Sequence, residues 1–170
     1  MASVRAEELG LNFDHWCFAC GRSNPIGLRL DLTFTKDRAD ARFTPDKRFQ
    51  GYDGIVHGGI VTALLDEVMG WAIFQQGIWA VTTRFELSFR RPMRVGEGVI
   101  ATGALTRDRG RALDLHGEVR READGEILAI ADGTYVRMSG SQRKAMIEKY
   151  GDPAPALARL AVALEEERAR

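Results

Sequence analysis

One stretch decides the fold of this chain: His57-Gly58-Gly59-Ile60-Val61-Thr62-Ala63-Leu64-Leu65-Asp66-Glu67-Val68-Met69-Gly70-Trp71-Ala72-Ile73-Phe74. Its length and the absence of an internal proline predict a helix. Apolar residues occur nearly all round this helix and are not confined to one stripe. A helix of this kind in a globular protein has to be wrapped by other structure.

Alternating apolar and polar residues flank this helix on both sides and predict strands. Before the helix, residues 28–34 and 39–43 alternate around a turn at Asp37-Arg38, which predicts a hairpin that ends at Pro45. We expect the strands after the helix to form an antiparallel meander, and the whole chain to be an α+β fold whose sheet curls around the helix. Four such runs follow the helix: Val81–Phe89, Val95–Thr106, Ala112–Arg121 and Glu126–Met138.

The C-terminal part of the sequence predicts two further helices. Ser139 to Tyr150 has the composition of a short helix, Gly151-Asp152-Pro153 breaks it, and apolar residues then recur at helical spacing from Leu157 to Leu164. The second helix packs on the surface of its own domain or contacts a partner subunit.

Charge and hydropathy exclude two classes of partner. Lys plus Arg and Asp plus Glu each number 24, and phosphate-backbone binding needs a basic excess, so we expect no nucleic acid. The first residues contain no apolar signal region, and the longest apolar stretch is interrupted by Asp66 and Glu67. We therefore expect no membrane segment and a cytoplasmic location.

The two cysteines, Cys17 and Cys20, have C-x-x-C spacing. Two thiolates are half of a structural zinc site, and His15 could add a third ligand, but the sequence shows no fourth. A redox site of the thioredoxin type needs a βαβ context that is absent here. We interpret the pair as structural or incidental, and we expect no metal and no cofactor.

Two features of the central helix carry candidate chemistry. Gly58 and Gly59 open the helix, where backbone N–H groups lack internal acceptors and the helix dipole is positive, so this end could bind a polarised carbonyl oxygen. Asp66 lies inside the apolar helix, where a carboxylate is costly unless it is paired or functional. The small side chains of Ala63 and Gly70 beside it leave room for a cavity. Asp66 is therefore a candidate general base, with an ion pair to an arginine or capping by backbone groups as the alternatives.

His57 and Asp66 are too far apart to act together within one chain. Nine residues of helix place them on opposite sides and about 13 Å apart along the axis. If both serve one site, two subunits have to supply them, most simply across a two-fold axis.

Several motifs together resemble the PaaI-like hotdog-fold acyl-CoA thioesterases. These are the H-G-G sequence at His57, the aspartate nine residues later in an apolar helix, and a strand that ends in Arg90-Arg91-Pro92. The leader Cys17-Phe18-Ala19-Cys20-Gly21, followed by Asn24-Pro25-Ile26-Gly27-Leu28, is also similar to that family. The resemblance covers residues 15–139 and implies a single hotdog domain there, preceded by a loosely ordered segment (1–14) and followed by a C-terminal helical extension (140–170).

The resemblance implies hydrolysis of an acyl-CoA thioester, without metal or organic cofactor, in a homodimer that in many members pairs into a tetramer. It implies that Asp66 acts as general base or nucleophile and that the Gly58 N–H binds the thioester oxygen. His57 would orient that loop or the thioester, and Thr82 would help to position the water. Asp66 would come from one subunit, and His57 and Gly58 from the other. Around them we expect substrate contacts from Gly59, Gln50, Thr83 and Met69.

One position departs from the pattern of some relatives, which carry an asparagine six residues before the histidine. Here that position is Gly51, with Gln50 and Asp53 as nearby polar candidates. Two other functions stay open: a non-catalytic acyl-CoA-binding module, and an enoyl-CoA hydratase or dehydratase of the same fold. For the latter, the histidine expected after Asn24-Pro25 is missing.

The identity of the acyl group cannot be read from the sequence. The aromatic residues near the end of the central helix form either an apolar pocket or part of the core: Trp71, Phe74 and Trp79. Arginines that could meet the CoA phosphates are Arg90, Arg91 and Arg137.

Overall fold

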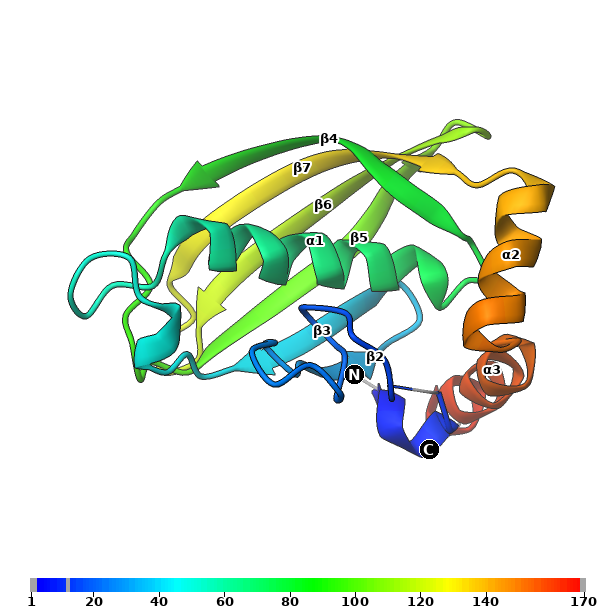
Figure 1. Cartoon of the computed structure of the whole chain (residues 1–170), viewed down its shortest axis with the longest axis horizontal. Helices are drawn as coiled ribbons and strands as arrows, with labels where there is room; N and C mark the ends of the chain where they lie inside the picture. The colour runs from blue at the N-terminus through cyan, green and yellow to red at the C-terminus, as the bar shows by residue number, and fades with distance from the viewer. Residues whose placement is uncertain (1–2, 12, 169–170) are drawn as a thin grey trace.

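The computed structural model describes residues 3–11 and 13–168. Residues 1–2 and 12, which belong to the segment expected to be loosely ordered, and residues 169–170 of the C-terminal extension lie outside the described residues. Within the described residues, a seven-stranded antiparallel sheet curves around a long helix, α1 (Gly58–Phe74) (Figure 1). The strands follow the order β1 (Val4–Arg5), β2 (Asp31–Phe34), β3 (Arg38–Phe43), β5 (Val99–Asp108), β6 (Ala112–Arg121), β7 (Ile127–Arg137) and β4 (Ala80–Phe89).

Glycines in the middle of the sheet let α1 lie unusually close to it. A Cβ atom at Gly103 of β5 would come within 2.5 Å of the backbone of α1 at Val68 and Met69, and one at Gly117 of β6 would come within 2.9 Å of the Met69 sulfur. Met69 is completely buried over these glycines. It therefore fills the core between helix and sheet, and the structure does not bring it to a surface where a substrate could touch it.

The expected meander of four strands is wrong in one respect. β5, β6 and β7 do form a meander, but β4 pairs with β7 at the edge of the sheet and not with β5. The reason lies in the connection between β4 and β5. It spans residues 90–98, contains Pro92 and is held by a bridge between Arg94 and Ile55. This long connection carries the chain across the end of the sheet, so that β5 pairs with β3.

The predicted hairpin before α1 is confirmed as β2 and β3, but its first strand begins later than the alternation suggests. Leu28 and Leu30 are buried although they precede β2. Their N–H groups bond to the Phe18 and Ala19 carbonyls (2.8 and 3.0 Å), so the alternation there reflects burial and not pairing within the sheet. Similarly, β5 starts at Val99, because Gly96 adopts a positive φ of 81° and turns the chain.

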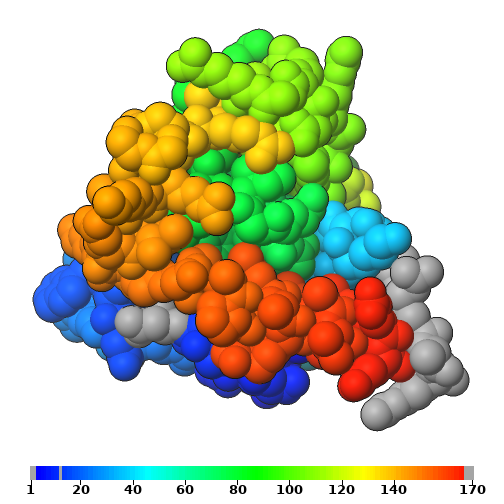
Figure 2. All heavy atoms as spheres, turned by 90° about the vertical axis from the view of Figure 1, so that its right-hand side faces the viewer, coloured from blue at the N-terminus to red at the C-terminus, as the bar shows by residue number. Residues whose placement is uncertain are grey.

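Both predicted C-terminal helices are present, as α2 (Gly140–Tyr150) and α3 (Ala154–Arg168). Ser139 caps α2 with a reciprocal capping box. α3 packs on the N-terminal segment, where the short 3-10 helix η1 (Ala6–Leu9) follows β1, and Arg159 donates a hydrogen bond to the Leu9 carbonyl (3.0 Å). Figure 2 shows this end of the molecule, with α2 and α3 in orange to red above the blue N-terminal residues. Among the described residues, no helix combines the length and the apolar character that crossing a membrane requires.

Candidate active site

The first turn of α1 leaves a single backbone donor free. His57 is the N-cap residue, and its Nδ1 accepts a hydrogen bond from the Gly59 N–H (2.9 Å). The N–H groups of Ile60 and Val61 both reach the His57 carbonyl, at 2.9 and 3.5 Å. The Gly58 N–H forms no hydrogen bond with the described part of the chain. His57 thus shapes the helix tip, and Gly58 presents the donor, as an oxyanion-binding group requires.

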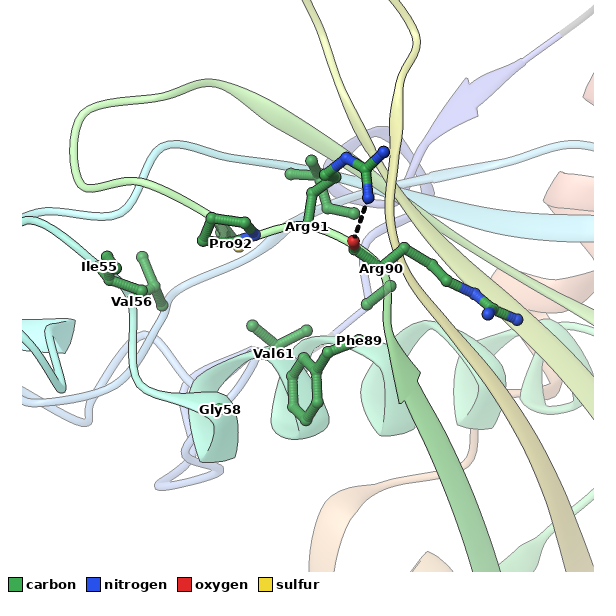
Figure 3. Close-up of a pocket in the computed structure, with 11 residues that line it drawn as sticks. Ile55, Val56, Gly58, Val61, Phe89, Arg90, Arg91 and Pro92 are labelled. Carbon is green, nitrogen blue, oxygen red and sulfur yellow. Dashed lines mark hydrogen bonds between the residues drawn. The ribbon is translucent and has the colours of Figure 1, made fainter.

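An apolar cavity of about 400 Å³ adjoins this donor (Figure 3). The ring of Phe89, at the end of β4, lies against Gly58, and a Cβ atom at Gly58 would come within 3.0 Å of that ring. Glycine therefore allows an aromatic side chain to approach the helix tip. Val61 and Pro92 line the same cavity.

The carboxylate of Asp66 is held by two hydroxyl groups. Thr82 of β4 and Tyr135 of β7 both donate to Asp66 Oδ1, at 2.6 and 2.7 Å, and Tyr135 also reaches the Asp66 carbonyl at 3.2 Å. Thr82 and Tyr135 face each other in the register of β4 and β7, so the sheet aligns both donors opposite α1. No described residue donates to Oδ2, which leaves this oxygen open for chemistry. The expected alternative, an ion pair between Asp66 and an arginine, is not formed with any described residue.

Tyr135 is a site residue that sequence reasoning missed. Its side chain is only 2% exposed. Burial raises the pKa of the phenol above its usual range, and the negative charge of Asp66 adds to this effect. Tyr135 therefore stays protonated and acts as a donor. A buried tyrosine needs a partner for its hydroxyl, and this was the one signal in the sequence that could have pointed to it.

Asp66 lies at a second and larger cavity of about 880 Å³. Its walls come from α1, from the start of β4, from the loop before β2 and from the C-terminal helices. Aromatic side chains form much of its surface. Of the two positions considered for them, core or pocket, the structure shows that Trp71, Phe74 and Trp79 line a cavity. The C-terminal extension contributes as well, through Met146 and Tyr150 of α2.

The two cavities share no lining residue. Gly58 belongs to the smaller one, at the tip of α1, and Asp66 to the larger one, about two helical turns further along. The structure thus agrees with the separation expected from helix geometry: one chain brings Asp66 and Thr82 together, and keeps His57 and Gly58 apart from them.

Other residues expected near the substrate take mainly structural positions. Gln50 accepts a hydrogen bond from the Gly54 N–H (3.3 Å) and so holds the loop before α1. Thr83 lies at an irregularity of β4, and its hydroxyl bonds to the Thr134 carbonyl (2.9 Å) outside both cavities. At Gly51, a Cβ atom would come within 3.3 Å of His57. The missing side chain of Gly51 therefore leaves His57 room to cap the helix.

The arginines considered for CoA binding differ in their contacts. Arg137 is committed to the Gly110 carbonyl and to Asp108, both at 2.6 Å. Arg91 pairs with Glu126 (3.2 Å) and also bonds to the Arg90 carbonyl (Figure 3). The Arg90 guanidinium, which points away from Arg91, has no ion-pair partner in the described part of the chain.

Comparison with known proteins gives a consistent result. The thioesterase superfamily model matches residues 53–128, which span α1, β4, β5, β6 and the beginning of β7. An acyl-coenzyme A thioesterase of Rattus norvegicus, THEM4, is 27% identical over 96 residues, which are 54% of this chain and 41% of that protein. A Deinococcus radiodurans protein is 38% identical over 85 residues, 49% of this chain and 57% of that protein. The chain thus spans about half the length of the curated relatives that it matches.

Solved structures share the fold. A crystal structure of a thioesterase superfamily protein is 28% identical, with a TM-score of 0.67 over 71% of this chain and 60% of that chain. The E. coli PaaI protein from the phenylacetic acid degradation operon is 22% identical, with a TM-score of 0.62 over 65% of this chain and 84% of its own. A Streptococcus mutans protein, solved with bound acetyl CoA, is 20% identical, with a TM-score of 0.61 over 65% and 89%. The chain thus has the hotdog fold of these solved structures, and residues 53–128, which are less than half of it, match the thioesterase superfamily.

Proposed function

We propose that this chain hydrolyses acyl-CoA thioesters to a free carboxylic acid and CoA, with Asp66 as general base or nucleophile. One observation carries the proposal: a carboxylate inside an apolar helix is held on one oxygen by Thr82 and Tyr135 and is open on the other, beside a cavity of about 880 Å³. The proposal draws further support from a curated relative that is an acyl-coenzyme A thioesterase and from a structural neighbour that binds acetyl CoA.

The residues suit the chemistry of thioester hydrolysis. As general base, Asp66 Oδ2 accepts a proton from water while the water oxygen adds to the thioester carbon. As nucleophile, the same oxygen adds to that carbon, the CoA thiolate leaves, and water hydrolyses the resulting anhydride. In both routes negative charge develops on the carbonyl oxygen, and the free Gly58 N–H stabilises it. The leaving thiolate takes up one proton, so that the products are the carboxylic acid and the CoA thiol.

A complete site requires a second copy of the chain. Asp66 and Gly58 line different cavities, so a substrate held by one Asp66 needs the Gly58 of another subunit. β4 is suited to make that contact. It is an edge strand of ten residues, and no described strand pairs with its outer side. Its apolar residues Val81 and Phe89 are 49% and 57% exposed. Pairing of two β4 strands about a two-fold axis would bury these side chains and make an isologous homodimer. Two such dimers would form the tetramer expected from the resemblance.

The cavity at Asp66 favours an acyl group with aromatic or long apolar character, because Trp71, Phe74 and Trp79 line it. The CoA moiety would then extend towards the smaller cavity of the other subunit, where Arg90, which has no ion-pair partner among the described residues, is the best-placed cation for a phosphate. Arg91 and Arg137 are already engaged by acidic partners or by carbonyl groups.

The experiment compares Asp66→Asn with wild type on a panel of acyl-CoAs, with release of free CoA followed by a thiol reagent. We expect the variant to lose most turnover while its oligomeric state, measured by light scattering, is unchanged. Asp37→Asn, an exposed aspartate in the turn between β2 and β3, is the matched control and should behave as wild type.

Two outcomes contradict the proposal. Full turnover by Asp66→Asn would show that this carboxylate is not the catalytic group. Tight binding of acyl-CoA by the wild-type chain without release of CoA would instead identify a binding module, and addition of water to an enoyl-CoA would identify a hydratase.

A further inference from the structure

Three metal-ligating side chains meet beside the larger cavity. Cys17 and Cys20, from the loop before β2, and Glu67, from α1, place one ligand atom each within 4.8 Å of one another. Cys17 and Glu67 are 50 positions apart in the chain, and no sequence pattern joins them. Glu67 thus adds a ligand that the C-x-x-C spacing does not reveal.

The cysteine loop forms a tight turn. The Gly21 N–H bonds to the Cys17 carbonyl (3.0 Å). A Cβ atom at Gly21 would come within 2.2 Å of the His15 carbonyl, so this tight turn requires glycine. This turn lies beside α1, where Cys17 and Cys20 meet Glu67.

Glu67 is oriented in advance. Trp71, one turn further along α1, donates its indole N–H to Glu67 Oε1 (2.8 Å). The other oxygen, Oε2, then lies 3.9 Å from the Cys17 sulfur. In many metal centres, a neighbouring group donates a hydrogen bond to the carboxylate ligand and so orients it toward the metal.

The cluster has little contact with water. Cys20 is buried, and Cys17 and Glu67 are partly buried. Three side chains of metal-binding type therefore converge in one poorly solvated place, where a single cation could contact all of them.

We propose that Cys17, Cys20 and Glu67 bind one Zn²⁺ ion. With Zn–S and Zn–O distances of about 2.3 and 2.1 Å, a tetrahedral site separates two sulfur atoms by about 3.8 Å and sulfur from oxygen by about 3.6 Å. The 3.9 Å between the Cys17 sulfur and Glu67 Oε2 lies within a few tenths of an ångström of that geometry. Two thiolates with a carboxylate favour zinc over the hard cations magnesium and calcium, which prefer oxygen ligands alone. Binding displaces the thiol protons into solvent.

The fourth coordination position faces the cavity, because all three ligands line it. His15 lines the cavity as well, and its Nδ1 already accepts a hydrogen bond from the Cys17 N–H (3.3 Å), so a water molecule or the His15 Nε2 would complete the site. An ion here would fasten the loop before β2 to α1, one residue from Asp66. It would act as a structural clamp on one wall of that cavity.

The test titrates the reduced full-length chain, stripped with a chelator, with Co²⁺ and then with Zn²⁺. We expect one equivalent of Co²⁺ per chain, with thiolate-to-metal charge-transfer absorption and the visible bands of a tetrahedral site, and displacement by Zn²⁺. The chain contains two cysteines in all, so such absorption reports this pair. Cys17→Ser and Cys20→Ser should each lose the intense absorption.

Glu67→Gln separates this site from a metal held by the cysteines alone. Loss of a group that only supports a ligand typically costs about 10- to 100-fold in metal affinity, so loss of the ligand itself should cost at least about tenfold. Glu148→Gln, an exposed carboxamide substitution on α2, is the matched control and should bind as wild type does. Zn²⁺ should also raise the Tm of the wild type but not that of Cys20→Ser.

The proposal is overturned if the wild-type chain shows no thiolate-to-cobalt absorption, if one ion is shared by two chains, or if Glu67→Gln binds as tightly as wild type. A Cys17–Cys20 disulfide that the reductant does not open, so that the chain takes up no metal, would overturn it as well. Because absorbance and Tm are the readouts, none of these results depends on the proposed hydrolysis of acyl-CoA.

Discussion

Replacement of Gly58 by proline should remove the oxyanion donor and leave α1 in place. Proline is favoured at the first position of a helix, which Gly58 occupies. The residue before a proline has to be extended, and His57 already is, with φ −61° and ψ 135°. The substitution therefore removes one N–H group at a position where the backbone accepts a proline ring.

The size of the effect follows from the hydrogen bonds of the first turn. The N–H groups of Gly59, Ile60 and Val61 are already bound to His57, so among the described residues of this turn the Gly58 N–H is the donor left for substrate. Loss of one oxyanion donor lowers kcat by about 10²- to 10³-fold, or about 2.7–4 kcal/mol. We expect Gly58→Pro to lose this much of both kcat and kcat/KM, because the lost interaction exists mainly in the transition state.

Gly58→Ala is the matched control. It introduces the same Cβ atom, 3.0 Å from the Phe89 ring, but keeps the N–H group. The assay is steady-state release of CoA from the best acyl-CoA substrate, with circular dichroism and light scattering as checks on fold and assembly. If Gly58→Pro is as active as Gly58→Ala while both are folded, the N–H of Gly58 does not stabilise the oxyanion and the reasoning is refuted.

Three further predictions concern assembly, the missed tyrosine and a surface pair. Asp66→Asn and Gly58→Pro chains, each nearly inactive alone, should recover about a quarter of wild-type activity when they are mixed and exchange subunits. The reason is that half of the dimers are then heterodimers, and each heterodimer holds one intact site out of two. No recovery in mixtures shown to contain heterodimers would place the site within one chain. Tyr135→Phe should lower kcat by about 10- to 100-fold with little change in KM, because it removes a hydrogen bond to a charged group; an unchanged kcat would mean that Thr82 alone holds the carboxylate. Burial opposes protonation of His116, but the hydrogen bonds and charges of Asp132 and Glu118 together outweigh it and raise its pKa. Because the pKa of His116 is higher in the folded state, its protonation stabilises the fold fully at pH values below the unfolded-state pKa of about 6.5. This stabilisation is lost as the pH rises through the folded-state pKa. Asp132→Asn should therefore lower the free energy of unfolding, measured by urea titration, at about pH 6 but not at about pH 9. An equal decrease at both pH values would show that Asp132 does not stabilise the fold through protonated His116.

Local patterns were sufficient to predict most helices and strands, including the central helix. The apolar run of residues 57–74 specified a wrapped helix, and period-two alternation specified the strands, because side-chain burial on a helix or a strand depends on spacing within a few residues. The separation of His57 from Asp66 followed from helix geometry alone, and the two distinct cavities agree with it. The position of β4 in the sheet could not be predicted from local patterns. Strand order depends on where a connection leads, and the bridge between Ile55 and Arg94 that guides this one joins residues far apart in the sequence.

By itself, the sequence determined the α+β class, the place of Asp66 in an apolar helix and the resemblance to hotdog thioesterases. The tertiary structure alone decided which groups touch that carboxylate, that Met69 fills the core, and that Glu67 joins Cys17 and Cys20. The physical reason is the same in each case. Periodicity says which face of an element is buried, but the partner that meets that face comes from another part of the chain, and its approach is set by the packing of the whole sheet on α1.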